Sequence, residues 1–363
     1  MTDRTVPDLH VRGVVLPEGE HQDLWIRDGR LTGEPVPGAE TVATGWVLPG
    51  LVDLHCHVGL DAHGAVPPDV AEQQALTDRD AGVLLIRDAG SPADTRWMDD
   101  RADLPRIVRA GRHLARTRRY IRNYGHEIEP DELVAYVEQE AARGDGWVKL
   151  VGDWIDRELG VLGPCWPAPA LAAAIGRAHE LGARVTAHVF GDAALPDLIG
   201  AGIDCIEHGT GLSPDLAAEM ARRGVAVVPT LVNIENFPGY ADAGEERFPA
   251  YAAQMRELHA QRYDTVRTAY ESGVPVYVGT DAGGVMPHGL AAREVLELVR
   301  AGLPRERAVG AASWDARAFL LGDHGGLVDG GPADLVVVAE DPRVNPATLL
   351  EPLRIVLRGR VVR

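Results

Sequence analysis

The sequence predicts an α/β fold, a (β/α)8 TIM barrel with a small β-sandwich domain formed by both chain termini. Two observations lead to this prediction. Strand-like and helix-like segments alternate through the middle of the chain, and both ends are rich in short β-type runs with hairpin-like turns. The expected domains are a β-sandwich from residues 1–46 and 326–363, and a barrel over residues 47–325.

Eight β-rich runs are expected to form the barrel strands. Each is short, apolar and β-branched, and is bounded by Gly, Pro or polar residues. The runs are VLPGLVDLHCH (47–57), VLLIRDAG (83–90), RIVRAG (106–111), WVKLVG (147–152), RVTAHVFG (184–191), IDCIEHG (203–209), VAVVPT (225–230) and PVYVGTD (275–281).

Amphipathic segments of helical length lie between most of these runs. Several begin with Pro or Ser-Pro and end at Gly, which are common start and stop signals of helices. The expected helices cover 67–82, 130–144, 167–182, 213–224 and 248–273. Eight alternations over roughly 230 residues favour a barrel over an open doubly wound sheet.

Charge and composition exclude several classes of partner. The 363 residues include 36 Lys and Arg against 54 Asp and Glu, a net charge of −18, which argues against nucleic acid or an anionic membrane as a partner. The start MTDRTVPDLHVRG lacks the apolar core of a signal peptide, and no apolar run approaches about 18 residues. We therefore expect a cytoplasmic protein, and Cys56, Cys165 and Cys205 are expected to be buried thiols.

The stretch LVDLHCHVGL places two histidines two residues apart at the end of a strand. His55 and His57 would point to the same face while Cys56 points to the other, as in a metal chelate. Two satisfied polar residues at a strand end would be an equally good explanation of this pair alone. The ends of other strands add Lys149, His188, His208 and Asp281.

Each added residue has an ordinary alternative, such as a solvated lysine, a core histidine or a turn-capping aspartate. All six positions, however, lie at the carboxyl ends of barrel strands, where such barrels place their active sites. The coincidence favours a metal centre.

These motifs are more specific than their separate residues. LPGLVDLHCH, VKL, TAH, IEHG and GTDAGG, with GLVDGGPADLVVV near the C-terminus, resemble the amidohydrolase superfamily, in particular its prolidase-like and imidazolonepropionase-like branch. The resemblance covers essentially the whole chain. It implies two divalent ions, with His55, His57 and Asp281 on the more buried one and His188 and His208 on the other.

The resemblance also implies that Lys149 is carboxylated and bridges both ions. An ammonium group is a poor ligand, whereas a carbamate has two oxygens that can span two metals. An unmodified Lys149 beside a single ion is the alternative. Zinc is the first expectation, with iron, manganese or cobalt also suited to His and carboxylate ligands.

The implied activity is that of a metal-dependent amidohydrolase. A metal-bridging hydroxide would cleave a C–N amide bond of a small carboxylate-bearing substrate, a dipeptide or N-acyl amino acid, with Asp281 as the catalytic proton carrier. A deaminase or a cyclic amide or lactone hydrolase of the same fold is the first alternative. HVFGDAAL lacks the glutamate that deaminases of this fold carry after the His188 position. A non-catalytic scaffold is the second alternative, although such relatives typically lose ligands.

Substrate-binding residues are expected in the loops that follow the strands. Seven arginines between positions 106 and 122 reverse the acidic character of the chain locally. They could clamp a carboxylate, or they could serve as a solvated loop or subunit contact. Segment 233–248 is expected to form a lid. The candidate substrate-binding residues are Tyr120, Arg122, Tyr124, Trp154 and His288.

Two acidic residues near the histidines are also assigned roles. Asp53 is expected to orient a histidine, and the alternative is a polar residue that closes the packed layers of the barrel. Glu207 is expected to point away from the metals and to be structural. The expected partner is a small-molecule substrate. Homo-oligomers are common among the related proteins, but the sequence indicates no subunit number.

Overall fold

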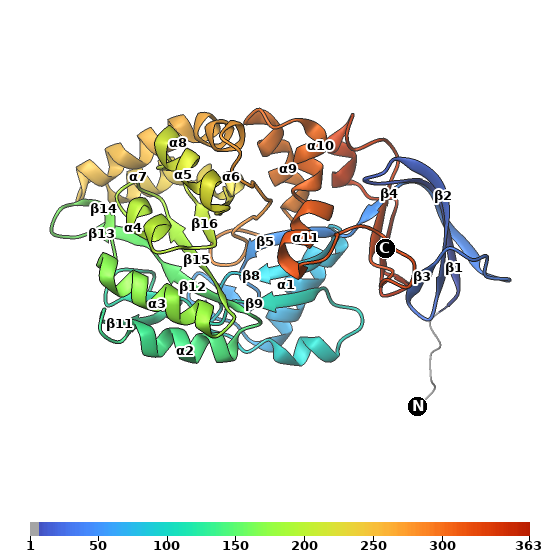
Figure 1. Cartoon of the computed structure of the whole chain (residues 1–363), viewed down its shortest axis with the longest axis horizontal. Coiled ribbons are helices and arrows are strands. Elements are labelled where there is room, and N and C mark those ends of the chain that lie inside the picture. Colours follow the sequence, from blue (N-terminus) through green and yellow to red (C-terminus); the bar gives the residue numbers. More distant parts are fainter. Residues whose placement is uncertain (1–6) are drawn as a thin grey trace.

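The structure of the chain, a computed structural model, describes residues 7–363 (Figure 1). Residues 1–6 of the expected terminal domain lie outside the described residues. The larger part of the molecule has strands at its centre and helices around them, and a separate sheet of blue and red strands lies at one end (Figure 1). This is a TIM-barrel-like α/β fold.

The central strands form two parallel sheets. A three-stranded sheet has the order β5-β8-β9, and a six-stranded sheet has the order β11-β10-β12-β15-β16-β17. The bounds of these strands are β5 Leu51–Cys56, β8 Val83–Asp88, β9 Arg106–Arg109, β10 Leu114–Arg116, β11 His126–Ile128, β12 Trp147–Val151, β15 Arg184–Val189, β16 Cys205–His208 and β17 Ala226–Val228. Antiparallel pairs β6 (Leu60–Asp61) with β7 (Gly64–Ala65) and β13 (Asp153–Asp156) with β14 (Val161–Pro164) lie in the loops.

The eighth expected strand, over 275–281, differs from the prediction. This segment is not assigned as a strand, yet together with the next residue, Ala282, it bridges both sheets through isolated parallel pairs, Val227 with Val276 and Cys56 with Ala282. The segment can approach β5 closely because residue 279 is glycine and has no side chain. A Cβ at this position would lie only 2.6 Å from the Cβ of His55, which is too close for two carbon atoms. The segment therefore joins the two sheets, and the complete closed barrel stays a prediction.

The five expected helices are confirmed as α1 (Pro68–Asp80), α2 (Leu133–Arg143), α3 (Ala168–Glu180), α5 (Pro214–Arg223) and α8 (Pro249–Glu271). In α5 the Ser213 hydroxyl accepts the N–H of Leu216, and Gly224 ends the helix with φ of 70°. The further helices are α4 Leu195–Gly200, α6 Leu231–Ile234, α7 Phe237–Gly244, α9 Ala291–Arg300, α10 Arg305–Gly310 and α11 Trp314–Leu321, with 3₁₀ turns η1 Arg96–Asp100 and η2 Pro346–Leu350.

Strands from both ends of the chain form one seven-stranded sheet, in the order β20-β19-β18-β4-β1-β2-β3. Their bounds are β1 Leu9–Val15, β2 Glu20–Arg27, β3 Arg30–Thr32, β4 Glu40–Pro49, β18 Leu335–Val338, β19 Arg354–Leu357 and β20 Arg360–Val361. The predicted association of the termini is therefore seen within residues 7–363, as a single sheet. The second layer of a sandwich and the domain boundaries stay predictions.

The expected strand over 47–57 divides at Gly50. Residues 46–49 pair with β18 in the terminal sheet, whereas residues 51–56 form β5. Leu335 and Val337 of β18 pack in a cluster with terminal-sheet residues, while Val336 and Val338 belong to the main core. Because neighbouring side chains of a strand point to opposite faces, this sheet packs against the main core with one face.

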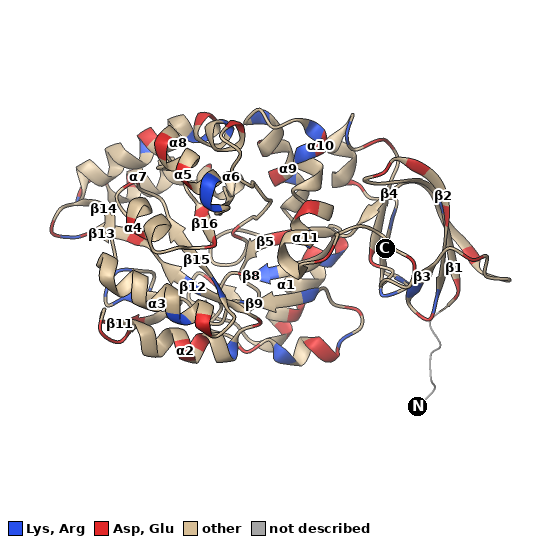
Figure 2. Cartoon of the chain, viewed as in Figure 1, with Lys and Arg blue, Asp and Glu red and all other residues tan. Residues whose placement is uncertain are grey.

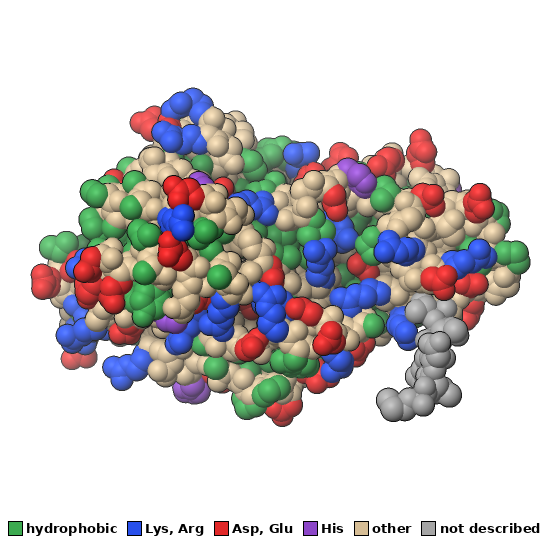
Figure 3. Space-filling model, turned by 60° about the horizontal axis from the view of Figure 1, so that its bottom comes forward, with side chains coloured by type: hydrophobic (Ala, Val, Ile, Leu, Met, Phe, Trp, Pro, Cys, Tyr) green, Lys and Arg blue, Asp and Glu red, His purple; other side chains and the backbone are tan. Residues whose placement is uncertain are grey.

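Acidic and basic side chains are interspersed over the elements (Figure 2) and on the face shown in Figure 3. In the described part of the chain, no helix combines the length and the apolar character that a membrane crossing requires.

Candidate metal centre

The six expected metal ligands come from five separate segments. His55 and His57 lie at the end of β5, Lys149 in β12, His188 in β15 and His208 at the end of β16, while Asp281 lies on the segment after α8. The histidines and the lysine are buried, and the Asp281 side chain is 22% exposed.

Asp281 lies between the two histidines of β5. Its Oδ1 is 3.1 Å from His55 Nε2 and 2.9 Å from His57 Nε2, and its Oδ2 accepts a hydrogen bond of 2.7 Å from Asn233. Ligand atoms of His55, His208 and Asp281 lie within 4.8 Å of one another. This spacing suits divalent metal held by imidazole and carboxylate, and it places His208, which is expected on the second ion, beside ligands of the first.

The remaining histidines are held in fixed orientations. His57 Nδ1 donates to the Gly90 carbonyl at 2.7 Å, and His208 Nδ1 lies 2.7 Å from the Thr230 hydroxyl. His188 Nδ1 lies 3.0 Å from His208 Nε2, and burial holds the pKa of both rings well below the usual value. The neutral rings of His188 and His208 keep a lone pair available to a metal ion.

Lys149 is fully buried, and its Nζ has no hydrogen-bond partner among the described residues. Burial lowers its pKa to about 8. A larger neutral fraction follows, and the neutral amine is the form that reacts with carbon dioxide to give a carbamate. An orphaned buried amine beside four histidines and an aspartate therefore fits the expected bridging ligand.

The backbone is strained at three positions of the site. His208, Thr230 and Asp281 adopt positive φ angles of 66°, 49° and 58°. Such conformations cost energy in non-glycine residues and are typical of functional sites. The left-handed turn at His208 also explains why neighbouring side chains of β16 both reach the site.

Glu207 corrects one expectation from the sequence. Its Oε2 lies 2.8 Å from His55 Nδ1, and its Oε1 contacts Arg87 and Thr186. Burial by itself would raise the pKa of the Glu207 carboxyl. The nearby positive charge, above all that of Arg87, outweighs burial and holds this pKa well below its usual range. Glu207 therefore faces the site and orients a ligand histidine, because strict alternation of side chains fails where the strand ends in a left-handed residue.

Asp53 holds the backbone of the site. Its Oδ1 accepts the N–H groups of His55 and Thr280 at 3.0 and 3.1 Å, and its Oδ2 accepts the Thr280 hydroxyl at 2.6 Å. Burial raises the pKa of Asp53 to about 7. The carboxyl joins β5 to the segment that carries Asp281, rather than contacting an imidazole.

His113 was not found by sequence reasoning. It is fully buried, neither ring nitrogen has a partner in the described structure, and its ring lies 5.1 Å from that of His57 and 5.3 Å from that of Tyr120. The sequence feature that could have identified it is its position in RAGRHLAR, soon after the third expected strand, where an active-site residue could lie. His113 lies behind the site and is not among the residues that line the cavity described below.

Three of the expected substrate-binding residues lie at the site. Tyr120, Tyr124 and Trp154 line a cavity of about 400 Å³ together with His57, His188 and Asp281. Arg122 is exposed and does not line the cavity, and His288 instead contacts Asp78 at 2.8 Å. The other walls include Leu162, Phe190, Tyr240, Phe248, Tyr251 and Val285.

Most of this wall is aromatic or aliphatic, and neither Lys nor Arg lines the described cavity. The expected lid segment, residues 233–248, forms part of the cavity wall. It contains the end of α6, all of α7 and the residues up to Phe248.

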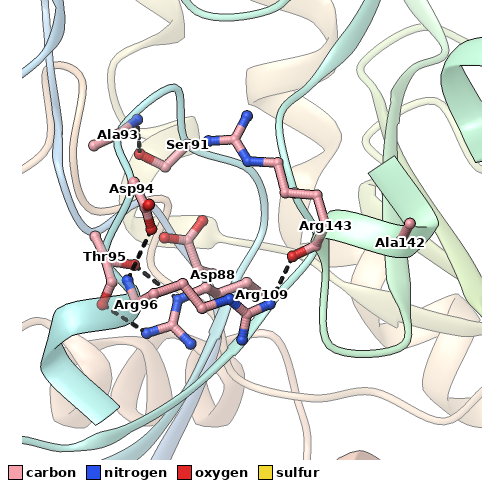
Figure 4. Close-up of a pocket in the computed structure, with 10 residues that line it drawn as sticks. Asp88, Ser91, Ala93, Asp94, Thr95, Arg96, Arg109, Ala142 and Arg143 are labelled. Atoms are coloured by element: carbon pink, nitrogen blue, oxygen red, sulfur yellow. Dashed lines mark hydrogen bonds between the residues drawn. The ribbon is translucent and has the colours of Figure 1, made fainter. Parts of the chain in front are cut away.

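The arginines of segment 106–122 are largely engaged elsewhere. Arg119 pairs with Asp156 at 2.8 Å, and Arg109 pairs with Asp99 at 2.9 Å and donates to Thr95. Arg109 lines a different, polar cavity of about 450 Å³, together with Arg96 and Arg143 (Figure 4). None of the six expected metal ligands lines that cavity.

Comparisons relate this chain to proteins of known sequence or structure. Uncharacterized proteins of Mycobacterium tuberculosis and Mycobacterium bovis are 58% identical over 354 residues, covering 97% of this chain and 95% of theirs. A solved Xaa-Pro dipeptidase has a TM-score of 0.84 at 22% identity, covering 98% of this chain and 99% of that one. The Aspergillus niger ochratoxinase has a TM-score of 0.80 at 19% identity, covering 99% and 96%.

The solved structures show a common fold. The family model described as "Amidohydrolase family" matches residues 46–362, which is most of the chain. The family expected from the sequence is thereby confirmed, and the chain belongs to the amidohydrolase family.

Proposed function

We propose that this chain is a metal-dependent hydrolase of a C–N amide bond in a small carboxylate-bearing substrate, such as an N-acyl amino acid or a dipeptide. The observation that carries the proposal is the convergence of four histidines, a buried unpartnered lysine and Asp281 beside one cavity, which His57, His188 and Asp281 line. The family supports hydrolysis, and both the dipeptidase and the ochratoxinase share the fold.

His55, His57 and Asp281 would hold one divalent ion, His188 and His208 a second, and carboxylated Lys149 both. Zinc fits these ligands best, and iron, manganese or cobalt are alternatives. When bound, such ions supply Lewis acidity, which lowers the pKa of a nearby water and polarises a carbonyl.

The chain itself handles the proton. Asp281 Oδ1 lies at the centre of the site, where it can take a proton from the attacking water and pass it to the leaving nitrogen. The Asn233 amide holds the other oxygen, Oδ2, so Oδ1 stays directed at the reacting atoms. Glu207 holds the ring of His55, which keeps this geometry fixed.

The cavity walls narrow the substrate class. Aromatic rings of Tyr120, Trp154, Tyr240 and Tyr251 offer stacking surface to an apolar or aromatic group. The hydroxyls of Tyr120 and Tyr124 are available to a substrate carboxylate in a cavity without Lys or Arg among its described lining residues. We therefore favour amides with one large apolar or aromatic part.

The proposal is tested by measuring metal content and hydrolysis of matched substrates. Purified protein is loaded with zinc or manganese and assayed against N-acyl amino acids and dipeptides with aromatic or small side chains, each also in C-terminally amidated form. We expect cleavage of the aromatic acids. Absence of cleavage of any amide by metal-loaded protein would contradict the proposal.

Two variants locate the substrate group. Trp154→Ala is expected to raise KM for aromatic substrates because it removes part of the cavity wall. Arg122→Ala is the matched control, since Arg122 is exposed outside the cavity. If Arg122→Ala instead raised KM selectively for substrates with a free carboxylate, Arg122 would be shown to bind that carboxylate.

A further inference from the structure

A second group of metal-ligating side chains lies outside the proposed centre. Cys56 of β5, Asp78 of α1 and His288 of the segment before α9 each offer a ligand atom, and these atoms lie within 4.8 Å of one another. Cys56 and Asp78 are fully buried, and the His288 side chain is 5% exposed. None of the three lines the substrate cavity.

The imidazole of His288 and the carboxylate of Asp78 face each other. Its Nδ1 lies 2.8 Å from Asp78 Oδ2, and the N–H of Gly289 donates to Asp78 Oδ1 at 2.8 Å. Nε2 of His288 is buried and has no partner among the described residues. A cation between Nδ1 of His288 and Oδ2 of Asp78 would take one ligand atom from each residue, with the imidazole proton on Nε2.

Negative charge accumulates around the group. The carboxylates of Asp53, Asp78 and Asp88 act electrostatically on both Cys56 and His288. Asp88 pairs with Cys56 across β8 and β5, and its Oδ2 also lacks a partner within residues 7–363. A buried region with several carboxylates stabilises a bound cation.

We propose that Cys56, Asp78 and His288 form a separate structural metal site for one zinc-like divalent cation. Sulfur and imidazole donors favour zinc over magnesium or calcium. On binding, the thiol proton of Cys56 is released to water, and the thiolate becomes a ligand. A water molecule completes the coordination.

The site would fasten one wall of the substrate cavity. Gly283, Gly284 and Val285 line that cavity and lie between Asp281 and His288 in the chain. A cation bound by His288, by Asp78 of α1 and by Cys56 of β5 would hold the end of this loop that carries His288 against these two elements. The inference does not depend on the proposed reaction, because its readout is sulfur coordination and not turnover.

The first experiment replaces bound metal with cobalt(II) and records absorption. The proposed catalytic centre has only nitrogen and oxygen ligands, so a near-ultraviolet sulfur-to-cobalt charge-transfer band reports the second site alone. We expect the band in the wild-type protein and its loss, with one cobalt fewer per chain, in Cys56→Ser and in His288→Gln. Cys165→Ser, which changes another buried thiol, is the control that retains the band.

A second measurement needs no variant. X-ray absorption of the zinc-loaded wild-type protein should show a zinc–sulfur distance of about 2.3 Å. Absence of sulfur around zinc and absence of the cobalt band would overturn the site, whatever the activity. Retention of the band in Cys56→Ser would also overturn it.

Discussion

Asp281 shows at the scale of one residue how backbone and chemistry are combined. Its φ of 58° is unfavourable for most side chains, but Asn and Asp adopt it most readily. Asn is therefore a substitution that removes the carboxylate and keeps the backbone.

Asp281→Asn is expected to lower kcat by about 10²- to 10⁴-fold, the contribution typical of a positioned proton carrier. The melting temperature should change little, whereas Asp281→Ala should lower it because Ala is strained at this φ. Steady-state kinetics and thermal melting of both variants check this. If Asp281→Asn turned over substrate at the wild-type rate, Asp281 would not be the group that transfers the proton.

Lys149 allows a second test at the same scale. Lys149→Ala is expected to lose bound metal and activity, because the buried bridging ligand is removed. Short carboxylic acids added to this variant should restore part of both, since the cavity left by the side chain can hold a carboxylate. Elemental analysis and assays with and without added acid measure the effect. Full metal content in Lys149→Ala would support the unmodified-lysine alternative.

At the scale of elements, α9 supports the Asp281 carboxylate through α6. The Glu294 side chain accepts the N–H groups of Leu231 and Val232, both at 2.8 Å, at the start of α6. Asn233 of the same helix donates to Asp281. Burial raises the pKa of Glu294 from 4.5 to about 8, so the folded protein holds this proton more tightly than the unfolded chain.

The sign of the pH effect follows from this shift. Between about pH 4.5 and about pH 8 the folded state keeps a proton that the unfolded chain has lost, so stability falls as pH rises. Glu294→Gln cannot titrate, and its free energy of unfolding should fall less over this range. Urea unfolding of both proteins at several pH values tests this. Parallel pH profiles would show that Glu294 does not contribute in this way.

At the scale of the whole molecule, β18 connects two hydrophobic clusters. Val336 packs in the main core and Val337 in the terminal-sheet cluster. Removing two buried carbons at either site should cost about 2 kcal/mol.

We therefore expect Val336→Ala and Val337→Ala each to shift the same single unfolding transition. Calorimetry shows whether this holds. Two transitions, with each variant moving only one of them, would indicate that the terminal sheet and the barrel unfold independently.

Prediction from sequence succeeded where the signal is local or chemically rare. Proline starts and glycine ends indicated five helices, and histidines at strand ends indicated which side chains to consider as ligands. It failed at Glu207, because period-two alternation does not hold beside the left-handed backbone of His208. It also assigned a strand to 275–281, where the chain forms only isolated pairs.

By itself, the sequence determined the family, the alternating β/α order and the residue types of the candidate metal centre. Only the tertiary structure decided that Glu207 holds His55, that the cavity is aromatic and without Lys or Arg in its described lining, and that Cys56 lies beside Asp78 and His288. The reason is physical. Periodicity reports which residues share a face of one element, whereas these contacts join residues separated by up to 232 positions, as between Cys56 and His288, and depend on how the elements pack.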